Sequence, residues 1–180
     1  MDRYNHICLR ATYNEWMNAK IYNAMIYELA DEIIAGQNDQ FDEVIKMLNH
    51  LIVVDTLWLK RFAIHPANYT ALESVLSLPT PENLEQIVST NIQELAEFRQ
   101  YLDKIICEWA HAISRIDLDH QLCYKTTQGV ITNHKFFSLI MYFFNYQTFI
   151  REKILALLLE VDIDVGATEL VVPMPSGINI

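Results

Sequence analysis

Apolar residues recur at every fourth position over long stretches of this chain, and this spacing restricts the possible fold more than any other feature. The first such series is Met17, Ile21, Met25, Leu29 and Ile33. Residues at this spacing lie on one face of an α-helix, which has 3.6 residues per turn. Only 4 residues are glycine and 5 are proline, so few positions interrupt such helices. The pattern predicts long helices and argues against a turn-rich β-sandwich.

Four long helices are expected, at about residues 4–35, 41–64, 80–116 and 133–161. The third is placed at Thr80-Pro81-Glu82, which combines an N-cap residue, a proline at the first helical position and an early acidic residue. Residues 117–131 alternate in polarity and turn at Gln128-Gly129, which predicts a short β-hairpin-like insertion before the last helix. The proline-containing tail, residues 166–180, is expected to lie across the helices as an extended strap. The sequence therefore predicts an all-α four-helix bundle that forms a single domain over residues 1–180.

The charge and cysteine content limit the class of partner and the compartment. The chain has 13 Lys and Arg residues against 23 Asp and Glu residues, a formal net charge of −10, and its basic residues are scattered. We therefore expect no nucleic-acid partner and no anionic membrane surface. The longest apolar stretch, residues 136–144, is too short to cross a bilayer. Cys8, Cys107 and Cys123 lie far apart, which is typical of a reduced, cytoplasmic protein.

Two polar residues interrupt the apolar face expected for residues 41–64. His50 is in series with Met47 and Val54, and Asp55 is in series with Leu51 and Trp58. Their spacing favours hydrogen-bonded core residues, although sites in helical bundles are also built from side chains on facing helices. The chain contains no His-Glu-x-x-His or Glu-x-x-His motif, no P-loop and no Gly-x-Ser-x-Gly motif. These motifs therefore assign no enzyme class.

Five segments of the chain together carry a family resemblance. Residues 13–18 have the pattern Y-N-x-W-x-N, and residues 48–61 have the pattern L-N-H-L-x-x-x-D-x-x-W-L-x-R. Residues 124–131 contain Gly129, residues 144–151 have the pattern F-N-x-Q-T-x-x-R, and residues 162–170 have the pattern D-x-D-x-G-x-T-x-L. With these segments in this order, most of the chain resembles the DinB/YfiT-like family of proposed metalloenzymes.

The resemblance implies a four-helix bundle, commonly a dimer, in which three histidines bind a divalent metal such as nickel or zinc. One comes from the second helix, and two come from an N-H-x-x-H-H-R pattern on the last. His50 matches the first ligand, whereas Tyr146 and Ile150 stand at the other two positions and Phe149 replaces the middle histidine. Isoleucine cannot bind a metal, and a phenol with a pKa of about 10 is a poor ligand. We therefore expect a degenerate site without a cofactor, or zinc or nickel only if the site is rebuilt.

Two functional hypotheses from different classes follow. The first is a non-catalytic homodimer that binds a small apolar ligand or a partner protein, because the last helix is apolar nearly all round. The second is a divalent-metal-dependent hydrolase or thiol transferase, as the resemblance implies, with a site rebuilt around His50 with Asp55 or Tyr146. A DNA-related role is disfavoured by the net charge. The pocket residues expected for either hypothesis are His50, Tyr146, Ile150, Asp55, Trp58 and Tyr13.

Overall fold

A computed structural model describes residues 2–28 and 39–168, which form a mainly helical structure with one two-stranded antiparallel sheet. The helices are α1 (Arg3–Glu28), α3 (Asp39–Phe62), α4 (Glu73–Leu76), α5 (Ile92–Ala112) and α6 (Phe136–Glu160). The strands are β1 (Gln121–Lys125) and β2 (Ile131–Lys135), and short 3₁₀ turns occupy Thr70–Leu72 and Asp117–Asp119. A search of the described helices reveals no segment with the length and hydropathy needed to span a membrane.

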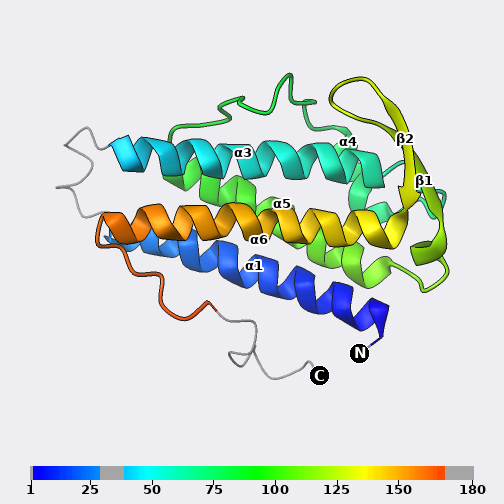
Figure 1. The fold of residues 1–180 in the computed structure, drawn as a ribbon, viewed down its shortest axis with the longest axis horizontal. Coiled ribbons are helices and arrows are strands. Elements are labelled where there is room, and N and C mark those ends of the chain that lie inside the picture. Colours follow the sequence, from blue (N-terminus) through cyan, green and yellow to red (C-terminus); the bar gives the residue numbers. More distant parts are fainter. Residues whose placement is uncertain (1, 29–38, 169–180) are drawn as a thin grey trace.

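The four long helices lie side by side along the long axis of the molecule (Figure 1). Helix α1 packs on α5 and α6, and α3 packs on the same two helices from the other side. The chain between α3 and α5 runs back along the outer side of α3, so that these two helices point in the same direction (Figure 1). This returning segment, residues 63–91, covers one edge of the seam between α3 and α6.

Aromatic side chains fix the end of α3 against its neighbours. The Phe62 ring stacks on Trp109 of α5, with 4.9 Å between ring centroids, and meets Phe136 and Phe143 of α6 edge-on. All four side chains are buried. Aromatic pairs of this kind add about 0.5–1.5 kcal/mol each beyond their buried area. The last turn of α3 is therefore held firmly, and it carries the residues that face the hairpin.

The third long helix begins at Ile92, so its predicted start at Thr80 is wrong. Asn91 caps the helix, because its side-chain oxygen accepts hydrogen bonds from the backbone amides of Gln93 and Glu94 at 2.8 and 3.3 Å. Ahead of it, the Asn49 side chain on α3 accepts from the amides of Val88 and Ser89 at 2.6 and 3.1 Å. These amides are satisfied across the structure instead of within a helix, and residues 79–91 remain a loop.

The predicted hairpin is confirmed. Strands β1 and β2 pair in antiparallel register with Leu122 opposite His134, and Gly129 turns the chain with a φ of 84°. Residues 133–135 belong to β2, so α6 begins at Phe136 and not at Asn133 as predicted.

Residues 163–168 run as extended chain against α1, as predicted for the start of the strap (Figure 1). Ile163 and Val165 are buried, and Tyr13 of α1 donates a hydrogen bond to the Thr168 carbonyl at 2.6 Å. The rest of the predicted strap, residues 169–180, and the predicted end of the first helix, residues 29–35, lie outside the described residues.

Candidate functional site

His50 and Tyr146 form a hydrogen-bonded pair between α3 and α6. The Nε2 atom of His50 lies 2.6 Å from the Tyr146 hydroxyl, and its Nδ1 atom lies 2.9 Å from the Leu84 carbonyl oxygen. A carbonyl oxygen only accepts, so Nδ1 carries the proton and Nε2 accepts from the Tyr146 hydroxyl. Both ring nitrogens are thus engaged by protein groups, one by the Tyr146 hydroxyl and the other by a backbone carbonyl.

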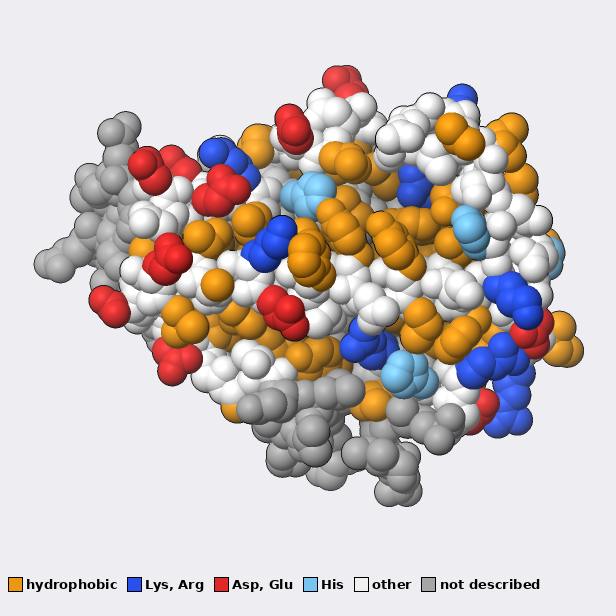
Figure 2. Space-filling model, viewed as in Figure 1, with side chains coloured by type: hydrophobic (Ala, Val, Ile, Leu, Met, Phe, Trp, Pro, Cys, Tyr) orange, Lys and Arg blue, Asp and Glu red, His pale blue; other side chains and the backbone are white. Residues whose placement is uncertain are grey.

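A groove of about 500 Å³ opens beside this pair and is here called the His50 groove. Its residues are Glu43, Lys46, Met47, His50, Leu84, Glu85, Ile87, Ile150 and Lys153. The apolar members come from α3, α6 and the loop that Asn49 holds in place, while the charged members surround them. Figure 2 shows hydrophobic side chains gathered on this face, over α3 and α6. The volume is typical of sites that bind small molecules.

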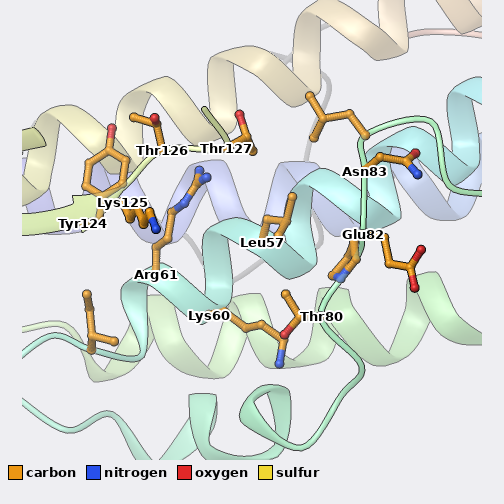
Figure 3. A pocket seen from close by; sticks show the side chains of 13 residues that line it. Leu57, Lys60, Arg61, Thr80, Glu82, Asn83, Tyr124, Lys125, Thr126 and Thr127 are labelled. Atoms are coloured by element: carbon orange, nitrogen blue, oxygen red, sulfur yellow. The ribbon is translucent and has the colours of Figure 1, made fainter. Parts of the chain in front are cut away.

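Two further cavities continue from the groove along α3. A small one lies between Trp58, Tyr142 and Tyr146, and a larger one of about 650 Å³ lies between α3, the returning loop and the hairpin (Figure 3). Leu84 lines all three cavities, and Leu57 lines the latter two. The cavities are therefore neighbours along one side of α3, beneath a single loop.

Asp55 lies elsewhere, in the centre of the protein. Its side chain is fully buried and accepts hydrogen bonds from Arg99 of α5 at 2.5 Å and from Gln147 of α6 at 3.0 Å. Each carboxylate oxygen thus has a partner, as a buried charge requires. The interpretation of Asp55 as a hydrogen-bonded core residue fits this geometry, and these contacts do not make it part of the His50 groove.

Asp55 belongs to a larger buried polar network that joins all four long helices. Asp103 of α5 contacts the Arg99 guanidinium at 3.0 Å and accepts from Asn14 and Asn18 of α1 at 3.0 and 2.9 Å. Arg151 of α6 in turn donates to both asparagines. The network is defined by Asn14, Asn18, Asp55, Arg99, Asp103, Gln147 and Arg151, all of which are buried.

The network holds two carboxylates and two guanidinium groups in surroundings from which water is excluded. Burial raises the pKa of Asp55 and raises that of Asp103 to about 6, and the positive charge of Arg99 opposes both shifts. Burial also lowers the pKa of Arg151 to about 10. Arg99 is paired with both carboxylates, whereas Arg151 donates to the neutral amide groups of Asn14, Asn18 and Gln147. The network connects the helices, and Asn18, Arg99 and Asp103 also line a cavity of about 360 Å³ between α1 and α5.

Five polar residues of the sequence patterns that carry the family resemblance belong to this network. Asn14 and Asn18 come from the first pattern, Asp55 from the second, and Gln147 and Arg151 from the fourth. Sequence reasoning missed its other two members, Arg99 and Asp103. Their signal is a charged pair at i and i+4 among the buried apolar residues of α5, which include Leu95, Leu102, Ile105, Ile106 and Trp109.

Of the six residues expected to share a pocket, the structure brings four together. Ile150 lines the His50 groove with His50, while Trp58 and Tyr146 line the adjoining small cavity. Asp55 lies in the buried network. Tyr13 lies on α1, where its hydroxyl binds the Thr168 carbonyl and its ring faces the Arg151 guanidinium at 6.0 Å.

The side chains around His50 do not fit the divalent metal that the resemblance implies. Ile150 offers no donor atom, the Tyr146 hydroxyl donates to the only free lone pair of the imidazole, and both Asp55 oxygens have partners. Within residues 2–28 and 39–168, no three His, Cys, Asp or Glu side chains gather as a possible ligand set.

The cysteines also lie outside the cavities. None of the three described cysteines forms a disulfide, and none lines the His50 groove or its two neighbours. Burial raises the thiol pKa of Cys8 and Cys107, so these two thiols are less reactive than an exposed cysteine.

Comparisons of the chain with protein-family models, with curated proteins and with solved structures find no match.

Proposed function

We propose that this protein is a non-catalytic four-helix bundle of the DinB/YfiT-like type, in which the metal site has degenerated and the His50 groove binds a small, largely apolar ligand. The hydrogen bond from Tyr146 to His50 carries the proposal. It occupies the nitrogen that a metal would need, and the phenol and Ile150 fill the space where two more imidazoles would stand. The groove has a volume of about 500 Å³, and it presents apolar side chains together with a histidine whose two ring nitrogens are already hydrogen-bonded.

A second copy of the chain is the partner that we propose for the protein. Helix α6 is apolar nearly all round, and Tyr142 and Phe149 on its outer side are each about half exposed. A second α6 covering these side chains would remove apolar surface from water, which is the main favourable term in protein association.

The ligand proposal is tested with a neutral, apolar fluorescent probe, N-phenyl-1-naphthylamine. Ile87 lines the His50 groove and is 48% exposed, so an Ile87→Lys variant places a charge in the groove without disturbing the core. We expect this substitution to weaken probe binding by about tenfold. Ile116→Lys is the matched control, because Ile116 is 85% exposed and lines none of the three cavities.

Two results would contradict the proposed function. One is probe binding that Ile87→Lys and Ile116→Lys affect equally, or no probe binding at all. The other is stoichiometric zinc or nickel retained by the wild-type protein after metal loading and desalting. The latter would favour the metal-dependent hydrolase or thiol transferase with a rebuilt site at His50.

A further inference from the structure

Arg61 is a cation without a counter-ion in the wall of the larger cavity. It lies in the last turn of α3 and is half-buried, and its guanidinium carbon lies 4.7 Å from the Trp58 ring centroid and 5.3 Å from that of Tyr124. Among the described residues, no side chain or carbonyl forms an ion pair or hydrogen bond with its guanidinium group. Its donors are thus free for a ligand, while the rings of Trp58 and Tyr124, whose centroids are 5.4 Å apart, lie together on one side of the guanidinium group.

The aromatic rings place the guanidinium where two cavities meet. Arg61 lines both the 650 Å³ cavity and the small cavity next to Tyr146, and Thr127 of the hairpin lines both as well. Figure 3 shows Arg61 rising from α3 toward the hairpin residues Tyr124, Thr126 and Thr127. A group bound by Arg61 would therefore have apolar walls on one side, toward Leu57 and the His50 groove.

The charges around this cavity favour an anion. Lys60 and Lys125 line it together with Arg61, and Glu82 is the single acidic residue among its lining residues. The Lys60 ammonium donates to the Leu76 and Leu78 carbonyl oxygens and has no carboxylate partner among the described residues. In a protein with a formal net charge of −10, this group of three cations is a local exception.

The geometry favours a carboxylate over a phosphate. A guanidinium group binds either a carboxylate or a phosphate through two parallel hydrogen bonds, so the position of Arg61 on its helix decides between the two anions. Arg61 lies at the carboxyl end of α3, where the helix carries a partial negative charge. That charge disfavours a doubly charged group more than a singly charged one.

We infer that Arg61 anchors the carboxylate of a ligand whose apolar body lies along Leu57, Trp58 and Leu84 toward the His50 groove. The inference rests on the proposed function and adds the chemical class of the ligand, a monocarboxylate with an aromatic or aliphatic body. Trp58 and Tyr124 are positioning residues in this assignment, because they hold the guanidinium group, and Arg61 is the residue that touches the ligand.

The test compares two probes of the same shape, 1-naphthaleneacetate and its neutral amide, 1-naphthaleneacetamide, by calorimetric titration. The wild-type protein is expected to bind the carboxylate about tenfold more tightly than the amide, since a charge-assisted pair contributes more than a neutral hydrogen bond. Arg61→Gln is expected to remove this preference and leave amide binding unchanged. Lys104→Gln, which removes an exposed cation that lines none of the three cavities, is the matched control and is expected to keep the preference.

Other outcomes separate this inference from the proposed function. Equal affinity for the two probes, or a preference that survives Arg61→Gln, overturns the assignment of Arg61 alone. The assignment of Arg61 is also overturned if neither the carboxylate nor the amide binds, while N-phenyl-1-naphthylamine still binds and its binding is weakened by Ile87→Lys. If that neutral probe also fails to bind, the proposed function falls with the inference. Near-UV circular dichroism of Arg61→Gln that matches the wild type shows that this variant is folded.

Discussion

At the scale of single residues, two side chains on α6 decide what His50 can do. The Tyr146 hydroxyl donates a hydrogen bond to the imidazole ring of His50. Ile150, one helical turn later, lines the His50 groove with an apolar side chain. In these surroundings both ring nitrogens of His50 are hydrogen-bonded to protein groups. Three histidines at these positions would instead form an open metal site, because zinc accepts three protein ligands and a water molecule.

Restoring the two histidines is therefore expected to create a metal site. A Tyr146→His/Ile150→His variant should retain about one zinc ion per chain after zinc loading and desalting, measured by elemental mass spectrometry, whereas the wild type should retain none. Tyr146→His/Phe149→His is the control, since Phe149 lines none of the three cavities and its ring is 52% exposed. Equal zinc retention by both double variants would show that position 150 does not face the same metal as His50.

At the scale of elements, hydrophobic periodicity located the helices and the hairpin, and it failed where a distant side chain decides the structure. Thr80-Pro81-Glu82 is a good helix start by local rules, yet residues 79–91 form a loop. The reason is Asn49, which lies about forty residues away and binds the backbone of Val88 and Ser89. No local pattern contains such a contact.

The same limit explains which parts of the site could be predicted. His50 with Tyr146 and Ile150 follows from the resemblance and from the spacing on one helix. Arg99 and Asp103 were missed, because charged residues on a helix usually face water and their burial depends on partners from three other helices. The surroundings of the Arg61 guanidinium group could not be predicted either, because one of its two aromatic neighbours, Tyr124, comes from the hairpin.

Helix α6 supplies the prediction that belongs to this scale. Its outer apolar face should pair with a second copy, so sedimentation equilibrium should give twice the chain mass of 21.0 kDa. Phe149→Glu places a charge on that face and is expected to shift the protein to monomers. Ile116→Glu, at an exposed apolar residue outside α6, should leave the dimer intact. A wild-type monomer, or a dimer that tolerates Phe149→Glu, would exclude α6 as the interface.

At the scale of the whole molecule, the buried polar network connects all four long helices at one place. Asn14 and Asn18 come from α1, Asp55 from α3, and Arg151 from α6. The remaining long helix, α5, supplies Arg99 and Asp103. Because every member has a partner on another helix, the complete set of hydrogen bonds forms only when all four helices are docked. The network thus fixes the mutual positions of α3 and α6, on which the His50 groove depends.

Arg99 is the residue that links both buried carboxylates, since it contacts Asp55 at 2.5 Å and Asp103 at 3.0 Å. Arg99→Met is expected to lower the free energy of unfolding by about 3–5 kcal/mol, because it leaves two buried carboxylates without their cation. Lys104→Met on the same helix is the control. Its exposed pair with Glu108, at 4.0 Å, should be worth less than about 1 kcal/mol. Urea unfolding followed by circular dichroism measures both values. A loss below about 1 kcal/mol for Arg99→Met would mean that apolar packing alone sets the positions of the four helices.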